Sequence, residues 1–207
     1  MADLQTVDPE VSRVKFEREL ANYRSMESAY RKRGWILLDA AFPEIFVVFA
    51  ATKPRPPPIV AAIVLNFTDY DLRPPSVRFV DPFTREPIPA KSLLIQMLRR
   101  PSGLSLQEFA TMLQQGAVPR MIQWNSPEDQ PFVCLPGVRE YHDNPAHTGD
   151  SWLLHRSSGE GSLPFILEKV WYYGVSPIDR YQVQVQVPME VQVPELNVLP
   201  SLLAVPE

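Results

Sequence analysis

Three consecutive apolar runs in the first third of the chain constrain its fold most strongly. They lie between residues 34 and 67 and read GWILLDA, EIFVVFAA and IVAAIVLNF, with the proline-rich break KPRPPP at residues 53–58. Runs of this length, rich in Val, Ile and Phe and bounded by turn residues, are typical of consecutive strands in an antiparallel meander. A fourth strand is expected at residues 77–79, because the proline pair at 74–75 forces extended backbone before it.

An amphipathic helix is expected to precede the strands. From Pro9 to Arg33 there is no interior Pro or Gly, and apolar residues recur at three- and four-residue steps. Three cations end this segment and Gly34 stops it, as at many helix C-termini. The segment is also the most basic of the chain, so it is either a solvated face or a docking surface for an acidic partner. Its other basic residues include Arg13, Lys15, Arg18 and Arg24.

Two further helical patterns follow the strands. Residues 89–115 carry apolar residues at helical spacing, and Pro-Ser-Gly at residues 101–103 divides this pattern into two short helices. Residues 163–173 form the last helical pattern, after a stretch without periodicity at residues 136–161. Helices on one side of an antiparallel sheet predict an α+β domain, which we assign to residues 1–181.

The C-terminal extension, residues 182–207, differs in composition from the rest of the chain. It begins with QVQVQV at residues 182–187, and prolines then recur every six residues. The alternation fits a strand that adds to the edge of a sheet, in this chain or in a partner. The prolines limit ladder hydrogen bonds and fit an extended tail equally well.

Charge and composition exclude several classes of function. The 20 Lys and Arg residues against 24 Asp and Glu residues give a net charge of −4, so no positive field for nucleic acid is expected. No apolar run approaches the roughly 20 residues of a membrane-spanning helix, and the acidic N-terminus lacks a secretory signal. A cytoplasmic protein is therefore expected. The sequence contains no Gly-rich phosphate loop, G-x-S-x-G or H-E-x-x-H motif, and no cofactor is predicted.

The single cysteine is the candidate nucleophile. Cys134 excludes an intramolecular disulfide, and it is followed within 13 residues by His142 and His147. A thiol becomes reactive as its thiolate, which a nearby imidazole promotes. The competing interpretation is a small core residue, because Cys134 stands between Val133 and Leu135 and free cysteines are often buried.

The same region offers a possible set of zinc ligands. Cys134, His142, His147 and Asp150 supply a thiolate, two imidazoles and a carboxylate. Their spacings match no standard zinc module, and we predict no metal ligand. A turn at residues 144–145 would instead orient His147 toward the thiol.

The order of these elements and one motif resemble ubiquitin-conjugating enzymes over about residues 10–173. The motif combines a tyrosine with a proline pair that enters the fourth strand, and a Cys-Leu pair, a tryptophan and a helix follow it. The residues that carry the resemblance are Tyr70, Pro74, Pro75, Val77, Phe79, Cys134, Leu135 and Trp152.

The chain departs from that family in three respects. The His-Pro-Asn tripeptide expected before the cysteine is missing, and the nearest candidate, Asn125, stands in a different motif. A long helical insertion separates Phe79 from Cys134, and residues 141–152 form a histidine-rich loop. This loop resembles divergent conjugating-type proteins that bacterial ubiquitin-like operons encode beside an activating enzyme and a JAB-type peptidase. Such operons are associated with defence against phage.

The resemblance implies a reaction and its partners. Cys134 would accept the C-terminal glycine of a ubiquitin-like modifier from an activating enzyme and pass it to an amine of a target protein. His147 or His142 would replace the missing asparagine as oxyanion donor, or deprotonate the amine, while Asp150 orients the imidazole. In the family, the first helix faces the activating enzyme.

Several alternatives stay open. Arg139 and Tyr141 are alternative residues for guiding the modifier's tail. The chain is alternatively an inactive conjugating-like adaptor that binds a ubiquitin-like protein without covalent chemistry, or a small zinc-dependent hydrolase that uses His142 and His147.

Overall fold

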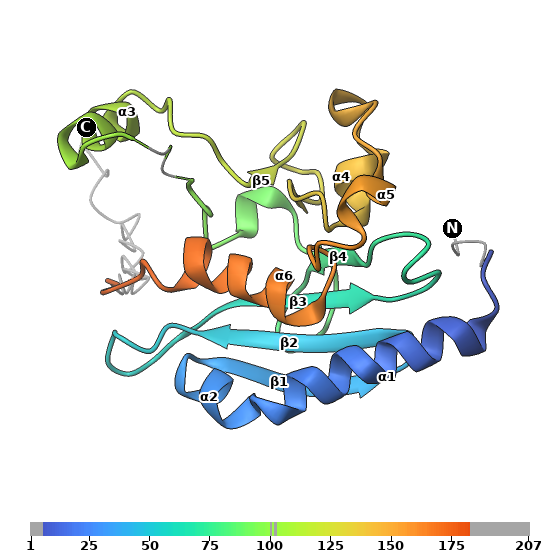
Figure 1. Cartoon of the computed structure of the whole chain (residues 1–207). Coiled ribbons are helices and arrows are strands. Elements are labelled where there is room, and N and C mark those ends of the chain that lie inside the picture. The colour runs from blue at the N-terminus through green and yellow to red at the C-terminus, as the bar shows by residue number, and fades with distance from the viewer. Residues whose placement is uncertain (1–5, 100, 102, 183–207) are drawn as a thin grey trace, which may run out of the picture.

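A four-stranded antiparallel sheet forms the centre of the molecule (Figure 1). The computed structural model describes residues 6–99, 101 and 103–182. The strands are β1 (Trp35–Ala41), β2 (Glu44–Ala50), β3 (Ile59–Asn66) and β4 (Ser76–Phe79). Their order in the sheet is their order in the chain, so the predicted meander is confirmed.

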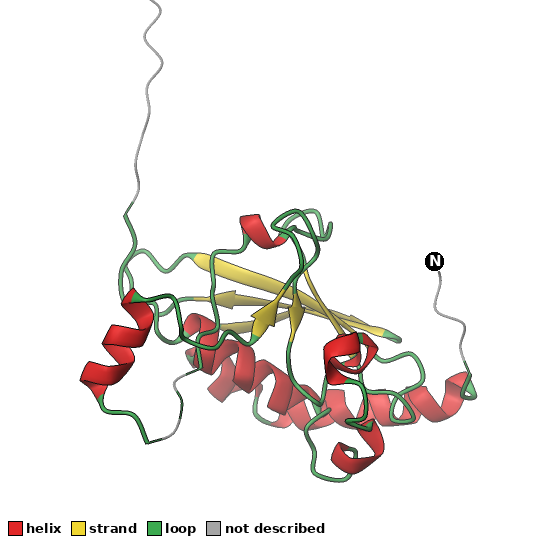
Figure 2. Ribbon diagram, turned by 90° about the horizontal axis from the view of Figure 1, so that it is seen from above, coloured by secondary structure: helices red, strands yellow, loops and turns green. Residues whose placement is uncertain are grey.

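The long helices pack on one face of this sheet (Figure 2). The elements are α1 (Pro9–Ser25), α2 (Glu27–Lys32), α6 (Leu163–Val170) and its π-helical continuation η3 (Trp171–Val175). The main core consists of the apolar face of α1, the buried face of α6 and alternate residues of β2 and β3. The protein is therefore a mixed α+β fold, as predicted.

A buried carboxylate connects the two main helices. Glu19 of α1 is 4% exposed, and it accepts a hydrogen bond from the backbone N–H of Leu163 at 3.2 Å, at the start of α6. It also accepts one from the hydroxyl of Tyr70 at 3.2 Å. Since a buried carboxylate is costly unless it is hydrogen-bonded, these contacts fix how α1 and α6 sit against the Tyr70 loop.

The expected single N-terminal helix is in fact two helices. Met26 leaves the helical conformation, with φ −114° and ψ 4°, and separates α1 from α2. The break allows Tyr30 to stack on Trp35, with ring centroids 4.4 Å apart and planes 12° from parallel. Tertiary stacking of the rings thus outweighs the local preference for a continuous helix.

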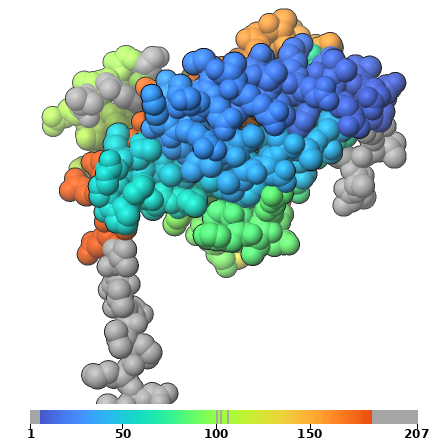
Figure 3. All heavy atoms as spheres, turned by 90° about the horizontal axis from the view of Figure 1, so that it is seen from below, coloured from blue at the N-terminus to red at the C-terminus, as the bar shows by residue number. Residues whose placement is uncertain are grey.

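The exposed side of α1 and α2 forms part of the molecular surface (Figure 3). Its cations are partly committed to intramolecular pairs. Lys15 pairs with Asp71, and Arg18 lies 3.3 Å from the buried Glu19. Arg24 is exposed.

The first half of the predicted helix at residues 89–115 is wrong. Among the described residues of this half, the helical structure is limited to a 3₁₀ turn, η1 (Ala90–Ser92). Burial then alternates, with Leu94 and Gln96 exposed and Ile95 and Met97 buried. The reason is a β-bridge from Leu98 to Arg120, which holds the end of this segment against residues 119–121. The second half is confirmed as α3 (Leu106–Gln114).

Short elements complete the domain. A two-stranded ladder pairs β5 (Ile122–Gln123) with β6 (Phe132–Val133). The stretch without periodicity holds three short helical turns. They are α4 (Arg139–Asp143), η2 (Pro145–His147) and α5 (Trp152–His155).

The described residues address the expected absence of membrane-spanning helices, but they include almost none of the C-terminal extension. In the described ranges, no helix combines the length and the apolar character needed to cross a bilayer. The predicted extension lies almost wholly outside the described residues, which end at residue 182.

Candidate active site

Cys134 follows β6 directly and faces a histidine. Its backbone N–H donates to the carbonyl of Met121 at 2.7 Å, which extends the β5–β6 ladder by one residue. Its Sγ atom lies 3.4 Å from Nε2 of His147. The side chain is half-buried, so it is neither sealed in the core nor fully open to solvent. Cys134 and a histidine of the following loop, His147, therefore lie close together, as predicted.

Burial raises the pKa of the Cys134 thiol, and the positive charge of Arg99 opposes that shift only in part. The resting group is therefore a thiol rather than a thiolate at neutral pH. Nucleophilic chemistry at this sulfur needs a base to take the proton, and Nε2 of His147 is the nitrogen in contact with it.

A short turn places His147. Asn144 caps η2, accepting a hydrogen bond at 2.9 Å from Ala146, and its carbonyl accepts the N–H of His147 at 3.0 Å. The ring of Tyr141 stacks on the His147 ring, with centroids 3.9 Å apart and planes 20° from parallel. The turn predicted at residues 144–145 does orient this histidine toward the thiol.

The carboxylate of Asp150, which was expected to orient the imidazole of His147 or His142, binds Tyr141 and His155 instead. Its Oδ2 accepts a hydrogen bond from the Tyr141 hydroxyl at 2.6 Å, and its Oδ1 lies 2.7 Å from Nε2 of His155. These two bonds lower the pKa of Asp150, and the bond to Asp150 raises the pKa of Tyr141 to about 12. The Asp150 carboxylate thus binds the hydroxyl of the tyrosine that stacks on His147, and the Asp150 backbone N–H donates to the His147 carbonyl at 3.2 Å.

His155 is held between two carboxylates. Its Nε2 faces Asp150, and its Nδ1 lies 2.7 Å from Oε2 of Glu160. The hydrogen bond to Asp150 is the largest cause of the raised pKa of His155, and Glu160 adds to it. Neither His155 nor Glu160 was predicted to belong to the site. The available signal was that all three histidines fall within one loop.

His142 braces the loop and does not contact the sulfur. Its Nδ1 lies 2.9 Å from the carbonyl oxygen of Asp150, and its Nε2 lies 2.6 Å from that of Pro136. Carbonyl oxygens only accept hydrogen bonds, so both contacts are satisfied when both ring nitrogens carry protons. The two histidines that the sequence treated as equivalent therefore have separate positions, and only His147 touches Cys134.

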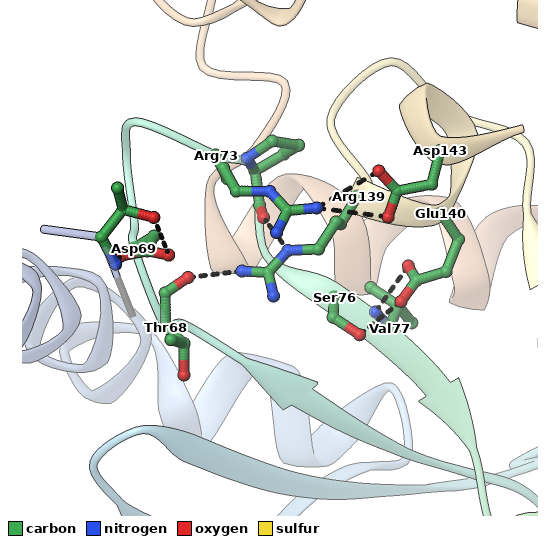
Figure 4. Close-up of polar contacts among 10 residues, drawn as sticks. Thr68, Asp69, Arg73, Ser76, Val77, Arg139, Glu140 and Asp143 are labelled. Atoms are coloured by element: carbon green, nitrogen blue, oxygen red, sulfur yellow. Dashed lines mark hydrogen bonds and ion pairs between the residues drawn. The ribbon is translucent and has the colours of Figure 1, made fainter. Parts of the chain in front are cut away.

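Arg139, the first residue of α4, connects this helix to the Tyr-Pro-Pro motif (Tyr70, Pro74 and Pro75), as Figure 4 shows. Its side chain donates to the carbonyl of Pro74 at 3.3 Å and to that of Thr68, and its backbone N–H donates to Pro75 at 3.0 Å. Only 3% of Arg139 is exposed, so the predicted role in guiding a partner's tail is wrong for this residue.

Glu140 makes the second connection between the same two segments (Figure 4). It accepts hydrogen bonds from the hydroxyl of Ser76 and, at 3.1 Å, from the backbone N–H of Val77. Burial raises its pKa although these bonds favour the charged form. On the surface nearby, Arg73 pairs with Asp143 at 3.2 Å. The Tyr-Pro-Pro motif and the cysteine loop are therefore parts of one structural unit.

A glycine permits close contact at the base of the site. A Cβ atom on Gly137 would lie 1.9 Å from the carbonyl oxygen of Glu160, which no side chain tolerates. Gly137 follows Cys134 by three residues, and Glu160 holds His155. The approach of these two backbones therefore closes the loop that carries the histidines.

The possible zinc ligands do not converge. Within the described ranges, no three His, Cys, Asp or Glu side chains lie together as a metal site. His142 faces carbonyls and the Asp150 carboxylate binds Tyr141 and His155, so the set is not assembled as the hydrolase alternative requires. Asn125 is exposed.

Comparison with known proteins places this fold and site in a family. The model of the Y4jH family (Y4jH-like) matches residues 7–178, which include all the elements of the site. A protein of Sinorhizobium fredii (strain NBRC 101917 / NGR234), named "Uncharacterized protein y4jH", is 54% identical over 191 residues. The match covers 90% of this chain and 93% of that relative.

Proposed function

We propose that this chain, which belongs to the Y4jH family, is a ubiquitin-conjugating-like transferase that carries its modifier as a thioester on Cys134. The observation that carries the proposal is the 3.4 Å contact between Cys134 Sγ and His147 Nε2, directly after a short strand. A nucleophile and a base within hydrogen-bond reach, with the base oriented by a third group, form the usual arrangement for covalent catalysis.

The arrangement of the elements supports the same proposal. A first helix packs against a four-strand meander, and the Tyr-Pro-Pro motif enters β4 as in the conjugating fold. Arg139 and Glu140 then bind that motif to the helix that follows the cysteine. This contact supports the proposal, because it holds the motif against the segment that carries the site.

The first step is transfer of an acyl group between two sulfurs. His147 Nε2 takes the proton of Cys134 as the sulfur attacks the thioester carbonyl on the activating enzyme. The tetrahedral intermediate collapses, the carbonyl carbon–sulfur bond to the activating enzyme breaks, and that thiolate leaves. The proton held by His147 lies beside the new thioester, where it stabilises negative charge in place of the missing asparagine.

The second step passes the acyl group to an amine. The amine nitrogen attacks the Cys134 thioester and releases a proton to solvent water, the carbonyl carbon–sulfur bond breaks, and an amide forms while the Cys134 thiolate leaves. His147 returns its proton to the departing sulfur, and the site is restored. The proposed partners are a ubiquitin-like modifier, its activating enzyme and a target protein, in a cytoplasmic bacterial antiphage pathway.

One observation favours the adaptor as second candidate. Burial raises the pKa of Cys134, and a high pKa is typical of structural rather than reactive cysteines. An adaptor would use the same fold to bind the modifier and would need no thiolate. The half-buried position of Cys134, which is not sealed in the core, and its contact with His147 favour the transferase.

A non-reducing gel separates the two candidates. The protein is incubated with an activating enzyme, a ubiquitin-like protein and nucleotide. The transferase gives an adduct that thiol reductant removes and that Cys134→Ala abolishes. An unmodified chain that nevertheless co-elutes with the modifier would identify the adaptor and contradict the transferase.

A further inference from the structure

Arg99 belongs to a segment that the backbone holds beside the cysteine. The carbonyl of Met97 accepts the N–H of Met121 at 2.9 Å, and the carbonyl of Met121 accepts the N–H of Cys134 at 2.7 Å. The N–H of Arg99 donates to the carbonyl of Pro119 at 2.9 Å. Three segments that are far apart in the sequence therefore lie side by side at the cysteine, and Arg99 is on one of them.

The charge of Arg99 acts on the sulfur. It lowers the pKa of the Cys134 thiol, against the larger effect of burial. Such an effect requires a guanidinium close to the sulfur, since exposed charges are screened beyond roughly 10 Å in dilute salt. The nucleophile thus has a cation near it as well as the imidazole of His147.

The guanidinium of Arg99 is uncommitted. Its side chain is exposed, and in the part of the chain that the structure describes it makes no hydrogen bond or ion pair. The four carboxylates of residues 135–161 do not neutralise it, because they already bind other groups. They are Glu140, Asp143, Asp150 and Glu160. An unpaired guanidinium beside a nucleophile is available to an anion that arrives with the substrate.

We propose that Arg99 binds a carboxylate of the acyl donor and so selects modifiers whose C-terminal glycine follows an acidic residue. The inference rests on the proposed transferase function and names its substrate class. A guanidinium donates two parallel hydrogen bonds to one carboxylate, which fixes the direction of the bound chain as well as its charge. Binding of the acidic residue would thus bring the neighbouring glycyl carbonyl to the sulfur of Cys134.

Two thioesters that differ by one charge test the proposal. N-acetyl-Glu-Gly and N-acetyl-Gln-Gly, each joined to the neutral thiol N-acetylcysteamine, are mixed separately with the full chain, and intact mass spectrometry follows acylation of Cys134. The quantity compared is the ratio of the two rate constants, glutamyl over glutaminyl. We expect this ratio to be about threefold higher in the wild type than in Arg99→Gln, and the difference to shrink in about 1 M salt.

Arg120→Gln is the matched control. Arg120 is also exposed and pairs by a β-bridge with Leu98, the residue before Arg99. Its guanidinium lies over the ring of Trp124, 5.5 Å from the centroid, so it has a partner of its own. The ratio in Arg120→Gln should therefore stay close to that of the wild type, and an equal fall in both variants would overturn the inference.

Alkylation separates failure of this inference from failure of the transferase. Iodoacetate and iodoacetamide modify Cys134 without acyl transfer and differ by one negative charge, and the ratio of their rates cancels any change in thiol ionisation. We expect the iodoacetate-to-iodoacetamide ratio to fall about threefold in Arg99→Gln and to hold in Arg120→Gln. Acylation by both thioesters with equal ratios in the wild type and Arg99→Gln would overturn the inference alone. No acylation by either thioester would contradict the transferase and, with it, the acyl donor as the ligand of Arg99.

Discussion

The ring of Tyr141 lies on the ring of His147, with centroids 3.9 Å apart, and the Tyr141 hydroxyl donates to Asp150 at 2.6 Å. Asp150 in turn contacts His155, so a chain of side chains runs from His155 to the Cys134 sulfur. The imidazole beside the thiol is thus positioned by packing rather than by a carboxylate hydrogen bond. Face-to-face packing restricts rotation of the His147 ring and keeps Nε2 toward the sulfur.

Substitutions at Tyr141 separate its ring from its hydroxyl. Tyr141→Phe keeps the stacked ring, and we expect the rate of Cys134 alkylation by iodoacetamide to stay within about threefold of wild type. Tyr141→Leu removes the aromatic face, and we expect a fall of about tenfold, smaller than the effect of removing a positioned base outright. Equal rates for the two variants would contradict a positioning role for the ring.

The His155 ion pairs predict a pH-dependent stability. Asp150 and Glu160 raise the pKa of His155 above its ordinary 6.5. His155 therefore binds its proton more tightly in the folded state than in the unfolded state. This stabilisation is complete below about pH 6.5 and is lost as the pH rises through the raised value. The melting temperature of His155→Gln should therefore fall below wild type most at pH 6, with a smaller difference at pH 9. A difference that grows with pH would contradict the prediction.

Arg139 in α4 and Arg73 beside the proline pair should differ sharply in their effect on stability. Arg139→Met removes the donor to the buried Pro74 carbonyl and to the half-buried Thr68 carbonyl, and we expect a loss of about 2–4 kcal/mol in the free energy of unfolding. Arg73→Met removes an exposed pair with Asp143 and should cost less than about 1 kcal/mol. Urea denaturation of both variants measures the contrast. Equal losses would show that Arg139 does not connect the two segments.

Gly137→Ala tests the close approach of the two loop backbones. The added Cβ would meet the Glu160 carbonyl, so the 160–161 segment must shift. We expect a loss of about 1–3 kcal/mol in unfolding free energy and faster exchange of loop amides, by urea denaturation and hydrogen exchange. Ser157→Ala, an exposed change in the same loop, serves as control. A neutral Gly137→Ala would rule out this contact.

Most of the fold can be predicted from the pattern of apolar residues in the sequence. The predictions that are wrong have identifiable physical causes. Long apolar runs, bounded by turn residues, predict the meander correctly because strand formation there agrees with burial. The pattern fails at residues 93–98, where a helical spacing of leucines is overridden by pairing with residue 120. It fails again at Met26, where Tyr30 must turn toward Trp35. Both errors arise from tertiary contacts that no local window contains.

The site is predictable only in outline. Spacing in the sequence brings Cys134 and the histidine loop together, but it does not distinguish His147 from His142. Nor does it indicate that Asp150 binds Tyr141 and His155, since those contacts depend on how three short helical turns pack. The buried arginine was misassigned for a related reason: an arginine in a loop is usually exposed, and only tertiary structure places Arg139 under the proline motif.

The central claim is that Cys134 takes up an acyl group with His147 as its base, and a small thioester tests it without any partner protein. The chain is mixed with the N-acetylglycyl thioester of 2-mercaptoethanesulfonate, and intact mass spectrometry follows acylation of Cys134. We expect acylation of the wild-type chain and a loss of about 100-fold in rate for His147→Gln. The matched variant His142→Gln, which alters a ring that does not touch the sulfur, should lose less than about tenfold. An unacylated Cys134, or equal rates for the two histidine variants, would contradict the account.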